Sequence, residues 1–141
     1  GGRVWMAAEA PVIYFPRRCI AALAGKFYTQ GAGGARTLTK HRLRPRPRQL
    51  APVATLGALV GGVALAPFAP GAAALVLAYP LLCLAWALAL AGRKRDGWML
   101  AAAPALVAMH LAWATGFLDS LLKAQAAGRR DAQREPRPVR N

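Results

Sequence analysis

The side chains in this sequence that could take part in chemistry are mainly cations. Lys26, Gln30, Arg36 and Lys40 fall in one short stretch of the first half of the chain. Such groups can meet a phosphate-bearing ligand, because they offset or hydrogen-bond its charged oxygens. The alternative is that the cations anchor the chain to lipid headgroups and fix its membrane topology. Their place before a long apolar run favours the second role without excluding the first.

Groups that could perform acid–base or metal chemistry are scarce. Glu9 and Asp96 stand alone, with no Asp-x-Asp pair, so we expect no catalytic residue, metal site or bound cofactor in this chain. Cys19 and Cys83 lie in different settings and indicate neither a disulfide framework nor a zinc site. His110 lies within an apolar segment, where a charge is costly, so we expect a neutral histidine with a structural hydrogen bond.

The elements that would position these side chains are membrane helices. Between Gln49 and Gly92 there is no Asp, Glu, Lys, Arg or His. As a helix rising about 1.5 Å per residue, this run would be roughly twice as long as a hydrocarbon core of about 30 Å, so it predicts two crossings. Two prolines and a glycine within 66–71 supply the turn. A second apolar stretch predicts a third crossing, and the three spans are expected at about 50–67, 72–92 and 98–118.

The predicted fold class is a mainly α, integral membrane protein with one further helix outside the spans. Apolar residues at helical spacing predict an amphipathic helix over 18–30 that lies in the cytoplasmic interface, with packing on a soluble domain as the alternative. The segment Gly31-Ala32-Gly33-Gly34 is expected to end this helix, and a basic connector completes the segment 17–48. Short β-rich runs within 1–16 predict either a hairpin or the last strands of the sheet of a preceding domain. The polar composition of 123–141 predicts a disordered basic tail.

The chain has a formal net charge of +14, and its charged residues lie in other parts of the sequence than its apolar segments. Such an excess can indicate nucleic acid, anionic lipid or membrane topology. Its position beside a span favours lipid and topology, so we expect membrane lipid and no nucleic acid as a partner. The expected interface anchors are Arg17, Arg18, Arg42, Arg44, Arg46 and Arg48.

The distribution of these cations also predicts an orientation. The positive-inside rule places the N-terminal segment in the cytoplasm, the uncharged turn outside, and Arg93-Lys94-Arg95 inside again. A third crossing would then send the basic tail outside, against the rule. Either the tail is an exception or segment 98–118 does not fully cross. Because that segment has the length of a full span, we expect three crossings.

An ordered series of short motifs carries a family resemblance. The motifs are Gly-Gly-Arg-Val-Trp at 1–5, Tyr-x-Pro-Arg-Arg at 14–18, Gly-x-Gly-x-Ala-Arg-Thr-Leu at 31–38, Leu-Arg-Pro-Arg at 43–46, Gln-Leu-Ala-Pro at 49–52 and Met-His-Leu-Ala-Trp at 109–113. In this order they resemble the C-terminal third of bacterial family 2 glycosyltransferases of the succinoglycan-biosynthesis type.

The resemblance implies a longer enzyme with a cytoplasmic α/β domain that uses a nucleotide sugar and a divalent cation, and residues 1–16 would be the end of that domain. It implies transfer to a lipid-linked saccharide acceptor in exopolysaccharide synthesis at the bacterial inner membrane. This chain would be the membrane-anchoring, acceptor-positioning part. Related enzymes carry Gln-x-x-Arg-aromatic on the interfacial helix, where this chain has Lys26, Thr29 and Gln30. The other hypothesis is a non-catalytic membrane protein that scaffolds through its helices.

Overall fold

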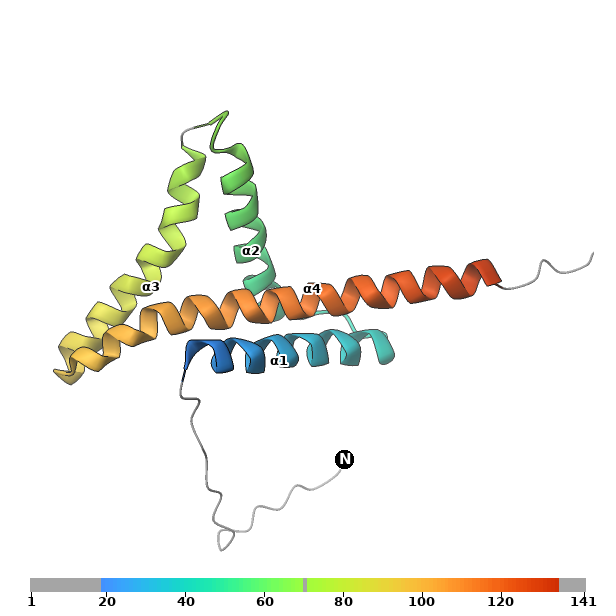
Figure 1. The fold of residues 1–141 in the computed structure, drawn as a ribbon, viewed down its shortest axis with the longest axis horizontal. Helices are drawn as coiled ribbons and strands as arrows, with labels where there is room; N and C mark the ends of the chain where they lie inside the picture. The colour runs from blue at the N-terminus through green and yellow to red at the C-terminus, as the bar shows by residue number, and fades with distance from the viewer. Residues whose placement is uncertain (1–18, 70, 135–141) are drawn as a thin grey trace, which may run out of the picture.

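The computed structural model describes residues 19–69 and 71–134, with side chains up to 127, and most of this part is helical (Figure 1). The helices are α1 (Ile20–Lys40), α2 (Pro47–Leu65), α3 (Ala72–Lys94) and α4 (Ala102–Arg134), with a short 3-10 helix, η1 (Gly97–Ala101), before α4. No strand occurs in the described residues. The mainly α prediction is confirmed, whereas the strands expected within 1–16 lie outside the described residues.

Three of the helical segments are long and apolar enough to cross a membrane. They are Pro47–Leu65, Ala72–Lys94 and Gly97–Ala127, close to the three predicted spans. In the most apolar stretch of α3 only 11% of the residues are buried within the chain, and side chains such as Leu82 and Trp86 are exposed. Apolar surface on this scale requires an apolar environment, which a bilayer supplies.

Helices α2 and α3 form a hairpin that meets near its turn and opens toward α4 (Figure 1). The two helices approach closely at Gly62, because a Cβ there would lie 2.8 Å from Cγ2 of Val76 and 3.2 Å from the carbonyl oxygen of Ala72. Further down, the hydroxyl of Tyr79 lies 2.6 Å from Nδ1 of His110 and ties α3 to α4. The structural hydrogen bond expected for His110 is therefore present.

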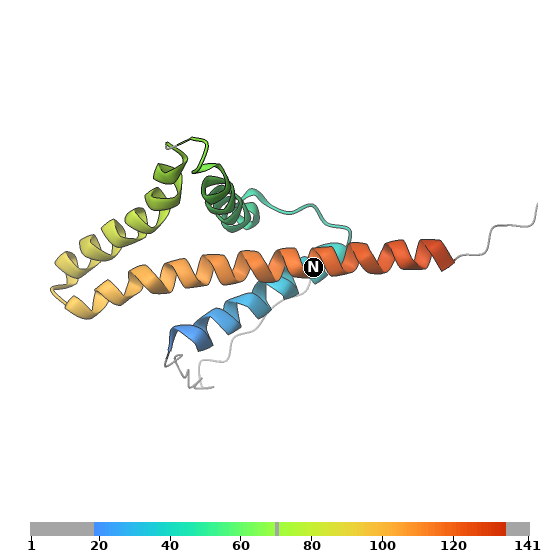
Figure 2. The ribbon, with the colours of Figure 1, turned by 45° about the horizontal axis from the view of Figure 1, so that its top comes forward.

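Helix α1 lies alongside α4 and runs in the same direction (Figures 1 and 2). It was predicted to end at Gln30, but it continues through the glycines at 31–34 to Lys40. Two of its contacts explain why. A Cβ on Gly31 would overlap the carbonyl of Trp113, and a Cβ on Gly116 would overlap the carbonyl of Tyr28. Because the two backbones touch, packing against α4 offsets the helix-propensity cost of glycine, about 1 kcal/mol per residue.

Helix α4 is also longer than predicted. Residues 123–141 were expected to be disordered, yet α4 continues to Arg134, and only 135–141 lie outside the described residues. Alanines at 124, 126 and 127 favour helix. The ion pair between Lys123 Nζ and Asp119 Oδ2, 2.7 Å apart, joins successive turns across the predicted boundary.

Candidate functional site

Arginines gather around a cavity between the second half of α1, the connector 41–46 and the first turn of α2. The cavity has a volume of about 400 Å³. Its lining residues are Gly34, Thr37, Leu38, Leu43, Arg44, Arg46, Arg48 and Gln49. All three arginines are exposed, so their guanidinium groups are open to a ligand. We call this the arginine cavity. Guanidinium groups bind phosphate oxygens in a bidentate manner, and three of them can neutralise a di-anion.

The sequence of the connector explains how two of these arginines come together. The N–H of Leu43 donates to the carbonyl of Leu38 at 2.9 Å, which folds the chain back onto α1. The N–H of Arg46 donates to Oε1 of Gln49 at 2.8 Å and caps the start of α2. Arg44 and Arg46 each precede a proline, which restricts them to extended backbone. In an extended segment, side chains two residues apart point to the same side.

A second, mainly apolar cavity adjoins the first. It has a volume of about 320 Å³ and lies between α1, the start of α2 and the first part of α4. Its lining residues are Phe27, Arg48, Gln49, Pro52, Met109, His110 and Trp113. The ring of Trp113 is held in place by stacking on Phe117, with centroids 4.9 Å apart. We call this the aromatic cavity.

Arg48 and Gln49 line both cavities, so the two hollows are neighbours. One offers guanidinium groups and the other offers aromatic and aliphatic carbon. An amphiphile with a phosphate head and a hydrocarbon tail has the same division of charge and apolar surface. The arrangement is therefore chemically suited to such a ligand.

A polar cluster joins α1 to α4 further along the pair. The Tyr28 hydroxyl donates to Oδ2 of Asp119 at 2.6 Å, and Lys123 donates to the same oxygen. The hydrogen bond to the Asp119 carboxylate raises the pKa of Tyr28 above its usual value. Arg36 and Ser120 line the same cavity of about 520 Å³. Because Asp119 is already bound to a lysine and a tyrosine, this cluster is explained by fixing α1 on α4.

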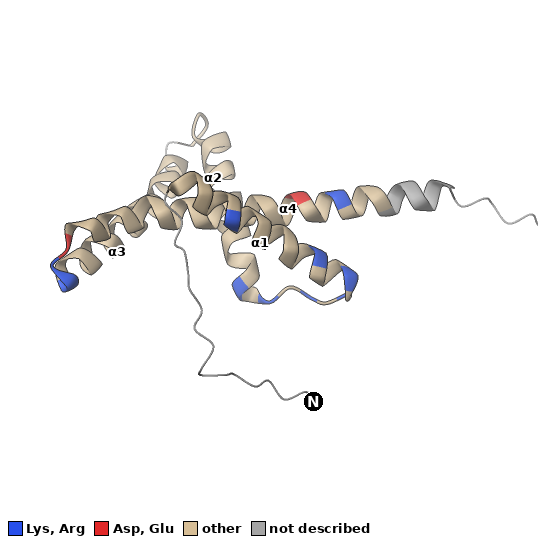
Figure 3. Ribbon diagram, turned by 60° about the horizontal axis from the view of Figure 1, so that its bottom comes forward, with Lys and Arg blue, Asp and Glu red and all other residues tan. Residues whose placement is uncertain are grey.

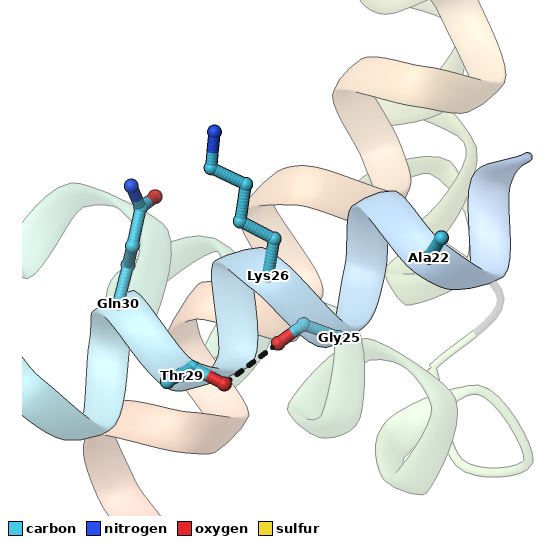
Figure 4. A pocket seen from close by; sticks show the side chains of 5 residues that line it. All are labelled: Ala22, Gly25, Lys26, Thr29 and Gln30. Carbon is cyan, nitrogen blue, oxygen red and sulfur yellow. Dashed lines mark hydrogen bonds between the residues drawn. The ribbon is translucent and has the colours of Figure 1, made fainter. Parts of the chain in front are cut away.

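The four residues predicted to contact an acceptor or phosphate are spread along α1. Lys26 and Gln30 line a cavity of about 370 Å³ and extend from the same side of the helix, whereas Thr29 turns back to the carbonyl of Gly25 (Figure 4). Arg36 lines the cavity beside Asp119, and Lys40 lies exposed in the last turn of α1. They share helix α1, but these cavities do not bring all four together.

The predicted interface anchors that the structure describes lie elsewhere. Arg44, Arg46 and Arg48 line one cavity together, Arg42 is exposed with a positive φ of 52°, and Arg17 and Arg18 lie outside the described residues. Sequence reasoning missed the aromatic cavity altogether. Phe27 belongs to the predicted amphipathic helix, and only the packing of α1 on α4 brings it to the same cavity as Trp113. The spacing of Asp119 and Lys123, one helical turn, was a signal for their ion pair.

Within the described part of the chain, no group of three His, Cys, Asp or Glu side chains could hold a metal ion. No family model matches the chain. No solved structure matches it either.

The comparison with curated proteins gives a relative. The chain is 33% identical to the succinoglycan biosynthesis protein ExoA of Rhizobium meliloti (strain 1021) over an alignment of 129 residues that covers 86% of this chain. It spans about 37% of the length of that relative and corresponds to its C-terminal part. The resemblance predicted from the motif series is thereby confirmed, and the chain is related to the C-terminal part of a protein of succinoglycan biosynthesis.

Proposed function

We propose that this chain is the membrane-anchoring and acceptor-positioning part of a glycosyltransferase that moves a sugar from a nucleotide donor to a lipid-linked acceptor in exopolysaccharide synthesis. The relative's role in succinoglycan biosynthesis supports the pathway class. The apolar helices support residence in a membrane, which we propose to be the bacterial inner membrane with the N-terminal segment in the cytoplasm. The nucleotide sugar and a divalent cation would bind to the catalytic domain of the full enzyme and not to this chain.

The observation that carries the proposal is the junction of the two cavities at Arg48 and Gln49. A lipid-linked saccharide bears a charged phosphate group between its sugar and its hydrocarbon chain. The arginine cavity would hold the phosphate, and the aromatic cavity would hold the first part of the hydrocarbon. The ligand would thus be fixed in position and depth before the transfer step.

Binding of farnesyl diphosphate, which carries both a diphosphate and an isoprenoid, tests this assignment. Calorimetry on the full chain in detergent should show binding that Arg46→Gln weakens about tenfold or more, since a hydrogen bond to a charged group contributes about 1.5–3 kcal/mol. The matched control is Arg93→Gln, which removes the same charge at the end of α3, away from both cavities. Equal affinity in the two variants would refute the site.

An activity assay separates the enzyme from the scaffold hypothesis. Membranes that contain the full-length protein should transfer sugar from a nucleotide donor to a lipid acceptor, and Arg46→Gln should raise the KM for acceptor more than that for donor. A full-length protein that neither binds the probe nor transfers sugar from any donor would indicate a scaffold instead.

A further inference from the structure

Charge divides the α2–α3 hairpin into an uncharged turn and two basic ends. No charged residue occurs between Gln49 and Gly92, and Phe68 in the turn is 86% exposed. The foot of α2 carries Arg44, Arg46 and Arg48, and the foot of α3 carries Arg93, Lys94 and Arg95. Figure 3 shows this separation, with basic residues at the end of α3 and on the segments that precede α2. A hairpin that crosses twice has both feet on one side, in agreement with the positive-inside rule.

The first part of α4 runs from one foot to the other. It follows the foot of α3 directly, through η1. Met109 and Trp113 then line the aromatic cavity together with Arg48 from the foot of α2. Residues 102–113 of α4, about 17 Å of helix at about 1.5 Å per residue, therefore begin and end beside feet that lie on the same side of the bilayer. A helix that connects two points on one side has not crossed.

The rest of α4 is unsuited to cross after that point. Asp119 and Lys123 lie within the next three turns, and only a few uncharged residues separate them from Trp113. This part is also paired with α1, and Arg36 lines a cavity with both of those charged residues. A crossing here would take Arg36 and the Asp119–Lys123 pair into the hydrocarbon, which is costly.

We propose that only α2 and α3 cross the bilayer, and that α4, paired with α1, lies along the lipid surface on the side of the basic feet. Its partner there is the layer of anionic headgroups and upper acyl chains. This arrangement places the basic C-terminal residues on the same side as the feet and removes the conflict that three crossings create. It goes beyond the proposed function and does not depend on it.

Labelling of single cysteines in sealed vesicles tests the topology. In a background with Cys19→Ser and Cys83→Ala, cysteine is introduced at one exposed position at a time: His41→Cys before α2, Ala69→Cys in the turn, or Gln125→Cys on α4. A membrane-impermeant maleimide should reach positions 41 and 125 from the same side and position 69 from the opposite side. Labelling of 125 together with 69 would establish a third crossing and overturn the proposal, and so would labelling of all three from one side.

The depth of single residues in the bilayer gives a second, independent test of the topology. Leu82 is 69% exposed at the middle of α3, and Ala108 lies at the middle of the predicted third span. A spin label at Leu82→Cys should lie about 15 Å below the hydrocarbon boundary, and one at Ala108→Cys about 5–10 Å or less. Equal depth would overturn the proposal. In the unsubstituted chain, alkaline phosphatase fused after Asn141 should be inactive, because it stays on the cytoplasmic side, and an active fusion would contradict this topology.

Discussion

The contact between α1 and α4 can be tested by adding one methyl group. Gly31→Ala introduces a Cβ that overlaps the carbonyl of Trp113, and the obstacle is backbone rather than a movable side chain. The two helices must separate to admit it. Overpacking of this kind costs about 1–3 kcal/mol.

The stability cost of the overlap has to be separated from the effect of helix propensity, because alanine stabilises a helix relative to glycine by about 1 kcal/mol. Gly33→Ala is the matched control. It lies on the same helix two residues away, and a Cβ there meets nothing within 4 Å. The propensity gain is common to both variants, so their difference measures the contact alone. We expect Gly33→Ala to be more stable than the natural chain, and Gly31→Ala to be less stable than Gly33→Ala by about 1–3 kcal/mol.

The assay is reversible unfolding of the full chain in mixed micelles with increasing SDS, followed by circular dichroism. Gly116→Ala provides an independent check from the other helix, because its Cβ overlaps the carbonyl of Tyr28. It should resemble Gly31→Ala. If Gly31→Ala and Gly33→Ala proved equally stable, α1 would not pack on α4 through its glycines, and the positions of both cavities would lose their support.

Three further changes test two hydrogen bonds and one helix end. Asp119→Asn should lower the ionisation midpoint of Tyr28 in an ultraviolet absorbance titration, because the hydrogen bond to the Asp119 carboxylate raises the pKa of Tyr28. That hydrogen bond stabilises the fold below about pH 10, and its contribution is lost as the pH rises through the raised pKa. Tyr79→Phe should reduce the unfolding free energy by about 1 kcal/mol, and a doubly substituted Tyr79→Phe/His110→Leu chain should recover part of it, since no polar group is left without its partner. Arg95→Gly should raise the free energy of unfolding by about 0.5–1 kcal/mol, because Arg95 ends α3 with a φ of 51° that glycine adopts without strain.

The spans could be predicted from the sequence because their signal is local. A long uncharged run and a proline-rich turn fix two helices without any knowledge of their neighbours, and α2 and α3 lie close to their predicted bounds. The end of α1 could not be predicted in this way. Glycines at 31–34 indicate a helix end when α1 is considered alone, and they allow close packing only once α4 is beside it.

The candidate site was predicted only in part, for a similar reason. The clustering of Arg44, Arg46 and Arg48 is visible in the sequence, and their assignment as anchors used that clustering alone. Their arrangement around a cavity depends on the fold-back of the connector onto α1. Phe27 and Trp113 are far apart in the sequence, so no local pattern indicates that they line one hollow.

The glycine contact between α1 and α4 has a consequence for how this protein can evolve. When a core side chain grows, a smaller residue opposite can usually restore the fit. Here Gly31 and Gly116 each oppose a main-chain carbonyl, and no substitution on the other helix can shorten a main chain. Neither position therefore has a partner whose change could compensate for its own. We expect both glycines to be substituted far more slowly than Gly33, even in lineages in which the surrounding side chains have changed.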